Sequence, residues 1–401
     1  MRLVMRFGVL SALAILAWPR ALPAAEMRGV TSTEIKIGQT MPYSGPVSAF
    51  GALGKGEVAY FRMLNDRGGI NGRRVNLISL DDGYAPPKTV EQTRRLVESD
   101  EVALIFSSIG TAQNTAIAKY LQGKNIPQLF VGSGASKFAD VAQYPQATLG
   151  VQGAFRYEAR LYARYALAQN PNAKFAVISQ NDDFGRDYLS GLKDVLGDRY
   201  DALVTGETYG VQDPTVDSQI VKLKASGADV LVIAATPKFA AQSIRKVHDI
   251  GWKPMTFLSN VAVWIKTVME PAGLEAGAGI LSTAYVKDPD DPAWKDDAGV
   301  KAWREFMAKY APEADPHDVN FVNAYNSAMT LEHVLKACGD DLSTENILQQ
   351  AFSIRDLELP MLLPGIRINT SPTDHVPVKQ MQFMRFNGKS WERFGELQTG
   401  D

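Results

Sequence analysis

The residues of this chain that could carry out chemistry are few and scattered. Its histidines show no spacing typical of a metal site, and they are His248, His317, His333 and His375. The one cysteine, Cys338 in "LKACGDD", has no neighbouring histidine to activate it, so a buried structural thiol is the better interpretation. Asp81-Asp82 ends an apolar run and could support acid catalysis or hold Mg²⁺, although paired carboxylates at such positions are more often loop caps.

The glycine-rich motifs also lack the spacing that cofactor chemistry needs. "GSGASKF" (132–138) misses the third glycine of a dinucleotide fingerprint, and "GALGKGE" (51–57) is not a phosphate loop. No G-x-S-x-G elbow occurs. We therefore expect no cofactor, no metal and no enzymatic activity. A secreted α/β enzyme using Asp81, Asp82 or Asp183 remains the alternative.

Small and hydroxylated residues recur where apolar strands end. The loops concerned are "MPYSGPVSAFG", "FSSIGTAQ" with Gly110 and Thr111, "FVGSGASK", "SQNDDFG", "AATPKF" with Thr236, and "LSNVAVW". Open parallel sheets bind ligands at the carboxyl ends of their strands. Helix N-termini at this edge favour a carboxylate, and Thr111 and Ser136 would add hydroxyl donors. We expect two such faces to clamp an anion without changing it.

The elements that must position these loops alternate between β-prone runs and helical patterns, which favours parallel sheets covered on both faces. In the first run, strands are expected at Ile35–Met41, Val75–Leu80, Val102–Phe106 and Pro127–Gly132. The helices of this run are expected at Phe50–Leu64, Pro87–Glu98 and Ala112–Leu121.

A second run of similar size follows Thr148. Its strands are expected at Phe175–Ser179, Leu203–Glu207, Val230–Ala234 and Met255–Leu258, with helices such as Arg156–Gln169 and Phe239–Ile250. Beyond Gly279 the pattern predicts one strand, three helices within 293–353, and a strand-rich tail over 365–394 with an Asn-Gly hairpin signal at 387–388. No low-complexity linker separates the two runs, so we expect lobes that share several crossings and hinge against each other.

The first 25 residues are typical of a secretory signal peptide. Two arginines precede the apolar run Phe7–Trp18, and small residues allow cleavage at Ala24 or Ala25. About a dozen apolar residues cannot cross a bilayer, which needs roughly 20. No cysteine lies near the cut, so we expect a soluble periplasmic protein without a lipid anchor.

Length and charge narrow the class further. A chain of 401 residues exceeds the size at which one core keeps growing, so two lobes are expected. One cysteine excludes an intramolecular disulfide. A net charge of -2 provides no broad basic field for nucleic acid or an anionic membrane. We expect no nucleic-acid partner, and a monomer is the default.

In its motifs the chain resembles the periplasmic solute-binding proteins of branched-chain amino acid ABC transporters. The stretches that carry the resemblance are "IKIGQTMPYSGPVSAFG", "LNDRGGINGRRVNLISLDDGYAPPKTVEQTRRLV", "GSGAS", "DDFGRDYLSGLK" and "PAGLEAGAGILSTAYV". The resemblance implies a type I periplasmic binding protein, an α/β fold with two doubly wound parallel-sheet lobes joined by a multi-strand hinge. The lobes would comprise 27–151 with 283–361, and 152–282 with 362–401. The implied partners are a small-molecule ligand, an ABC permease and its ATPase.

The resemblance also implies a ligand site between the lobes. A ligand carboxylate would be held by Thr111 and by Gly134, Ala135 and Ser136 of "GSGAS". Aromatic caps would be Phe50, after "SGP", and Phe184, in the loop of the second lobe. The acid that normally pairs the ligand ammonium corresponds to Asn260, and a second acidic contact corresponds to Phe155 or Arg156.

This departure changes the ligand that we expect. A buried ammonium without an anion costs on the order of several kcal/mol, so a free amino acid is disfavoured. With Phe50, Phe155 and Phe184 about the cleft, and Arg156 as a further anchor, an apolar or aromatic organic acid becomes the leading hypothesis. The alternatives are a branched-chain amino acid-binding protein and a ligand-sensing subunit of the same fold.

Overall fold

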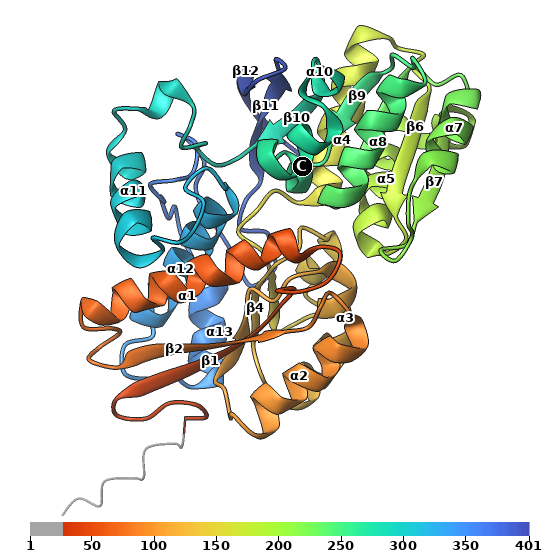
Figure 1. Ribbon diagram of the computed structural model, residues 1–401. Helices are drawn as coiled ribbons and strands as arrows, with labels where there is room; N and C mark the ends of the chain where they lie inside the picture. Colours follow the sequence, from red (N-terminus) through yellow and green to blue (C-terminus); the bar gives the residue numbers. More distant parts are fainter. Residues whose placement is uncertain (1–26, 401) are drawn as a thin grey trace, which may run out of the picture.

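The computed structural model describes residues 27–400, and the expected signal peptide, residues 1–25, lies outside this range. Two sheets are arranged one above the other in Figure 1, each with helices on both faces. The first sheet is parallel, has the order β2-β1-β3-β4-β5, and comprises β1 (Glu34–Met41), β2 (Arg74–Asp81), β3 (Leu104–Phe106), β4 (Gln128–Val131) and β5 (Ala147–Leu149). Its strands are apolar because both faces are covered.

The helices of the first lobe occupy opposite faces of this sheet. One face is covered by α1 (Gly51–Asp66) and α12 (Asn320–Ala337), and the other by α2 (Pro86–Glu98) and α3 (Thr111–Gly123). Two further helices, α11 (Ala298–Tyr310) and α13 (Thr344–Ala351), pack against α1 and α12 respectively. Helices from distant parts of the sequence therefore complete the first lobe.

The second sheet has the order β12-β11-β10-β9-β8-β6-β7. Its parallel strands are β6 (Phe175–Gln180), β7 (Val204–Tyr209), β8 (Val230–Ala234), β9 (Met255–Leu258) and β10 (Leu281–Ala284). An antiparallel hairpin, β11 (Gln380–Phe386) and β12 (Trp391–Thr399), extends the β10 edge, and Gly388 in its turn has a φ of 92°. The Asn-Gly hairpin signal is confirmed, whereas residues 365–379 of the expected strand-rich tail form isolated bridges and turns.

Helices again cover both faces of the second sheet. One face carries α4 (Phe155–Gln169) and α5 (Asp183–Leu196), and the other carries α7 (Asp217–Ala225) and α8 (Pro237–Asp249). The short helices are α6 (Tyr200–Leu203), α9 (Glu270–Ala272) and α10 (Leu274–Gly277). The predicted α/β class with two doubly wound, mostly parallel sheets is confirmed. Among the described residues, no helix combines the length and the apolar character needed to cross a bilayer.

Three chain segments connect the two sheets. Gly153 forms a parallel bridge with Val378, and Val286 forms an antiparallel bridge with Leu362. The Leu149 N–H donates to His375 O at 3.1 Å, so the chain still accompanies β5 at residue 375. The lobe boundary that we expected at 361–362 lies inside the loop that precedes this contact.

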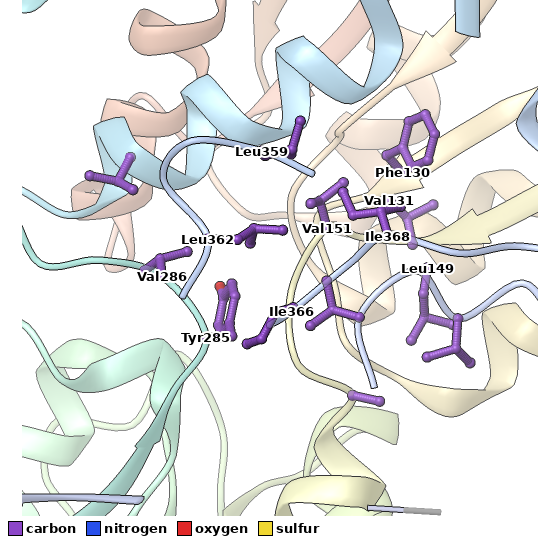
Figure 2. Close-up of a cluster of buried hydrophobic side chains, with 14 of the residues drawn as sticks. Phe130, Val131, Leu149, Val151, Tyr285, Val286, Leu359, Leu362, Ile366 and Ile368 are labelled. Atoms are coloured by element: carbon purple, nitrogen blue, oxygen red, sulfur yellow. The ribbon is translucent and has the colours of Figure 1, made fainter. Parts of the chain in front are cut away.

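An apolar cluster fills the space around these connections. Figure 2 shows Leu362 and Ile366 near Tyr285, and Ile368 near Val131, with Phe130 and Leu149 of the first sheet on the same side of the view as Ile368. All of these side chains are buried. The connections therefore run through a packed core rather than through a floppy linker, as the sequence predicted.

Close packing of α1 on α12 provides a first prediction. A Cβ added to Gly56 would lie 2.6 Å from the Ala324 Cβ and 3.0 Å from Phe321 Cδ1. Gly56→Ala should therefore lower the free energy of unfolding by about 1–3 kcal/mol, because overpacking outweighs the gain in helix propensity. Thermal and urea denaturation measure the change.

Gly123 supplies the matched control for this prediction. It is the exposed last residue of α3, and an added Cβ would meet nothing within 4 Å. Gly123→Ala should leave stability unchanged or raise it by up to about 1 kcal/mol. A Gly56→Ala protein as stable as the Gly123→Ala protein would contradict the packing argument.

Candidate functional site

The carboxyl ends of the strands of both sheets border a cavity of about 50 Å³ between the lobes, here called the inner cleft. The site residues predicted from sequence that line it are Phe50, Gly110, Thr111, Phe155, Phe184 and Thr236. The other lining residues are Leu53, Tyr84, Ile109, Gly132, Ser133, Gln152 and Val261. None of these side chains carries a formal charge, so recognition here must use hydroxyls, amides, backbone groups and rings.

The polar end of the inner cleft is built at the start of α3. Gly110 precedes the helix with a φ of 108°, and Thr111 is its first residue. The Thr111 Oγ1 lies 2.7 Å from the Ser133 Oγ, which also accepts the Ala135 N–H at 3.1 Å. The first amides of a helix lack intrahelical partners and carry partial positive charge. Two hydroxyls beside this helix end can therefore bind a carboxylate.

Ser133 is a lining residue that the sequence reasoning did not select. It lies within the "GSGAS" motif, one position before the residues that were chosen. Gly134 instead accepts the Phe155 N–H through its carbonyl at 2.9 Å, and Ala135 is fully buried. Gly134 and Ala135 therefore shape the turn behind Ser133 and do not line the inner cleft.

The aromatic side chains form the apolar end. Phe155 and Phe184 make an edge-to-face contact with ring centroids 4.7 Å apart. Phe184 lies in the first turn of α5, which begins after Asp182 caps it by accepting the N–H groups of Phe184 and Gly185. Phe50 meets Trp264 of the other lobe edge-to-face at 5.1 Å. Trp264 was not predicted, and only its position after "LSNVAV" could have indicated it.

Asn260 lies next to the inner cleft, in a narrower cavity of about 40 Å³. This narrow cavity shares lining residues with the inner cleft, namely Phe50, Leu53, Ile109, Gly132, Gln152 and Val261. Asn260 is only 8% exposed, and its side-chain oxygen has no hydrogen-bond partner among the described residues. Its Nδ2 lies 3.9 Å from the Met381 Sδ, a weak acceptor.

A buried carboxylate that the sequence reasoning missed holds the Asn260 backbone. The Asn260 N–H donates to Glu158 at 3.1 Å, and the hydroxyls of Tyr162, Tyr188 and Thr283 surround the same carboxyl group. Burial raises the pKa of Glu158 to about 7. Glu158 lies three residues after Phe155 in α4, so it belongs to the helix where a second acidic contact was sought. It lines none of the cavities described here.

Ser136 and Arg156 lie outside the inner cleft. Asp187 of the second lobe accepts the Ser136 N–H at 2.6 Å and its hydroxyl at 2.7 Å, while burial raises the pKa of Asp187 to about 6. Arg156 makes two hydrogen bonds to Asp194, at 2.6 and 2.7 Å. Lys137 pairs with Asp183 across the lobes at 2.6 Å. Ser136, Lys137 and Arg156 line a separate surface pocket, and each of them already has a carboxylate partner.

Thr236 completes the wall from the second lobe. It precedes α8, its N–H donates to the Tyr209 hydroxyl at 2.9 Å, and its own hydroxyl lies 3.2 Å from the same oxygen. Across residues 27–400, no group of three or more His, Cys, Asp and Glu side chains is arranged to hold a metal ion. The hydroxyls and rings that line the inner cleft are groups that can form hydrogen bonds and ring contacts with a small molecule.

Two α/β lobes, three connecting segments and a cleft between the sheet edges are the architecture of a bilobal binding protein. Residues 34–390 match the model of the periplasmic binding protein family, and the chain belongs to that family. Members of this family bind small solutes and work with ABC transporters; they are not a class of enzyme. The resemblance predicted from the motifs is confirmed.

Relatives and solved structures agree with this assignment. The chain is 27% identical over 328 residues to the Leu/Ile/Val-binding protein homolog 1 of Brucella abortus (strain 2308), covering 78% of this chain and 81% of the relative. A branched-chain amino acid ABC transporter structure from Thermus thermophilus with bound valine superposes with a TM-score of 0.80 at 16% identity, covering 92% and 97% of the two chains. A fatty acid ABC transporter substrate-binding protein from Thermomonospora curvata gives 0.75 at 18% identity, covering 92% and 94%.

Proposed function

We propose that this protein is the periplasmic solute-binding component of an ABC importer, and that its ligand is a small apolar or aromatic carboxylic acid. The observation that supports this ligand class is the inner cleft itself, whose lining includes Thr111 and Ser133 at one end and Phe155 and Phe184 at the other. No carboxylate lines it to pair an ammonium group, and the neighbouring side chain is the amide of Asn260.

The proposed mechanism is closure of the two lobes around the ligand. Thr111 and the start of α3 bind the carboxylate from the first lobe, and Phe184 and Thr236 then contact the ligand from the second. A ligand shifts an open–closed equilibrium only by its difference in affinity for the two states. Groups that touch the ligand from both lobes supply this difference. A membrane permease, driven by an ATPase, would then receive the ligand from the closed monomer.

Branched-chain amino acid binding is the second candidate, and the names of the relatives favour it. The valine bound in the Thermus thermophilus structure also favours an amino acid ligand. The two candidates differ in one group, because leucine and 4-methylpentanoate share a carbon skeleton and a carboxylate, and only leucine carries an ammonium. A sensing subunit would use the same closure and would differ in its partner, which the presence or absence of adjacent permease and ATPase genes distinguishes.

Calorimetric titration with leucine, 4-methylpentanoate and benzoate tests the ligand class. We expect at least one of the two acids to bind, and leucine to bind at least about tenfold more weakly, because its ammonium loses hydration without gaining an anion. Thr111→Val should weaken acid binding by about tenfold, and Asn260→Asp should move the preference toward leucine. Micromolar leucine binding without measurable binding of either acid would overturn the proposed ligand class.

A further inference from the structure

A second and larger cavity, here called the outer chamber, lies on the far side of Asn260. Its volume is about 330 Å³, and it shares Asn260, Trp264, Tyr285 and Asn323 with the narrow cavity. The two lobes both contribute to its wall, with Val319 and Asn323 from the start of α12 facing Met384 and Trp391 of the β11–β12 hairpin. The outer chamber is large enough for a ligand of its own.

The body of the outer chamber is apolar and aromatic. Trp264 and Trp391 line it together with Val263, Ile265 and Met384. The Trp391 Nε1–H donates to Val263 O at 2.7 Å, which fixes the position of this indole. Tryptophan faces attract cations through their ring quadrupole as well as packing on apolar groups.

The rim of the outer chamber carries more acidic groups than its cations neutralise. Asp291 pairs with Arg393 at 3.0 Å, and Asp290 lies 2.7 Å from His317. Asp288 and Glu270 also line the chamber, and neither forms an ion pair within residues 27–400.

Lys266 and the surroundings of Asp288 contribute to this excess of negative charge. Lys266, the chamber's other basic side chain, pairs with Asp315 at 2.6 Å, and Glu270 acts on Lys266 through its charge without forming an ion pair within 4 Å. The Asp288 carboxylate accepts the Asp290 N–H at 2.9 Å, and burial raises its pKa. The positive charge of a cationic ligand would offset the desolvation cost of the Asp288 carboxylate, and its N–H groups would donate further hydrogen bonds to that carboxylate.

A third, independent observation is the buried oxygen of Asn260. Asn260 lines the outer chamber and is only 8% exposed. Its Oδ1 has no hydrogen-bond partner among the described residues. An unpaired buried acceptor costs about 1–3 kcal/mol, which a donor from a ligand would recover. Carboxylates, an amide oxygen and indole faces all suit an N–H donor that carries positive charge.

We propose that the outer chamber is a second ligand site, and that it takes an organic cation with an apolar or aromatic body, such as a primary arylalkylamine. The ammonium group binds near Asp288 and Glu270, and the apolar body packs on Trp264 and Trp391. This site is separate from the carboxylate site of the inner cleft, and it does not depend on the ligand proposed there.

A ligand bound in the outer chamber should also change the affinity of the inner cleft for its own ligand. Both cavities are lined by residues of both lobes, and Phe50 and Trp264 meet in the wall between them. A ligand in either cavity therefore favours the closed state, and coupling between two sites is reciprocal. We expect the amine to bind equally tightly or more tightly when an acid occupies the inner cleft.

The test uses phenethylamine as the probe, with 2-phenylethanol as its neutral analogue. Calorimetry, with tryptophan fluorescence as a second readout, should show saturable binding of one phenethylamine per chain and at least about tenfold weaker binding of the alcohol. Asp288→Asn and Glu270→Gln should each weaken phenethylamine binding by about three- to tenfold. Asp198→Asn, at an exposed position in the second lobe, is the matched control and should leave it unchanged.

Three results would overturn the proposal. These are the absence of saturable phenethylamine binding at millimolar concentration, equal binding of amine and alcohol, and unchanged amine binding in the Asp288→Asn/Glu270→Gln double variant. A titration repeated in excess benzoate adds a fourth, since mutual exclusion of the two molecules would mean a single shared site. Glu270 is exposed, so Glu270→Gln keeps the test valid if Asp288→Asn fails to fold.

Discussion

Glu158→Ala should lower the free energy of unfolding by about 3–5 kcal/mol at pH 7, the largest loss that we expect from a single substitution in this protein. The carboxyl group of Glu158 is fully buried among Tyr162, Tyr188 and Thr283, and it accepts the Asn260 N–H. Alanine would leave a cavity and an unpaired backbone amide. The tyrosine hydroxyls would still have hydrogen-bond partners in this variant, because Tyr162 keeps Leu258 O and Tyr188 keeps Ser259 Oγ.

Urea denaturation of the wild-type and Glu158→Ala proteins measures this loss. Glu91→Ala is the control, because Glu91 is an exposed residue of α2, and the change there should be within about 0.5 kcal/mol. Glu158→Gln keeps the shape of the side chain, so it should lower the free energy of unfolding by less than Glu158→Ala does. If Glu158→Ala unfolded within about 1 kcal/mol of wild type, the carboxyl group would not be the organising centre of the network.

The Glu158 network should also influence ligand binding. It fixes the backbone at Asn260, which lines both the narrow cavity and the outer chamber. A folded Glu158→Gln protein should therefore bind phenethylamine in the outer chamber with altered affinity in calorimetry, although Glu158 does not line that chamber.

Glu57→Gln should stabilise the protein at neutral and mildly alkaline pH, by on the order of 3 kcal/mol. Glu57 is fully buried in α1, where Gln39 donates a hydrogen bond to its carboxyl group, and the interactions of Gln39 and Ser107 with this group offset only part of the effect of burial. Burial raises the pKa of Glu57 from its ordinary value of 4.5 to about 8. The unfolded chain therefore releases this proton at lower pH than the native protein does.

The sign of the pH dependence follows from this order of pKa values. Below pH 4.5 both states hold the proton, and Glu57 adds no dependence. Between pH 4.5 and about 8 the native state binds more protons than the unfolded state, so stability falls as the pH rises. Above about pH 8 both states are ionised and the penalty is constant. Glutamine does not titrate and removes this loss.

Denaturation of the wild-type and Glu57→Gln proteins at pH 5, 6, 7 and 8 measures the effect. We expect the difference between them to be small at pH 5 and to grow toward pH 8. Glu158 contributes a slope of the same sign in both proteins, because its pKa is raised to about 7. Glu91→Gln, at an exposed position, should follow wild type throughout. A constant difference from pH 5 to 8 would mean that Glu57 does not titrate in this range.

The fold could be predicted from the sequence because its signals are local. Apolar runs such as Val230–Ala234 become fully buried parallel strands, and the Asn-Gly pair at 387–388 forms the β11–β12 hairpin. The tail at 365–379 was predicted wrongly as strand-rich. Leu362, Ile366 and Ile368 are apolar because they are buried in the core around the connecting segments. A run of buried apolar residues in a loop has the same sequence pattern as a buried strand.

The site was harder to predict because its decisive contacts are distant in sequence. The hydroxyl residue Ser136 looked available, but Asp187 of the other lobe already binds it, and only the three-dimensional structure brings these two together. In the sequence, Glu158 has no feature that distinguishes it from other glutamates in helices. Its contacts with Thr283 and Asn260 are visible only in the structure. Loop chemistry at strand ends, by contrast, predicted Thr111, which lines the inner cleft because parallel sheets place those loops at one edge. Phe184, which also lines the inner cleft, was implied by the family resemblance.

The interleaved order of the chain has a consequence for synthesis. The first lobe needs α12 and α13, and the second sheet needs β11 and β12, all of which follow β10 along the chain. A nascent chain that stops before Gln380 leaves β10 as an unpaired edge, which is a template for association with other chains. Neither lobe can therefore be completed from a contiguous first half of the chain, and the second sheet stays incomplete until β11 and β12 have been made.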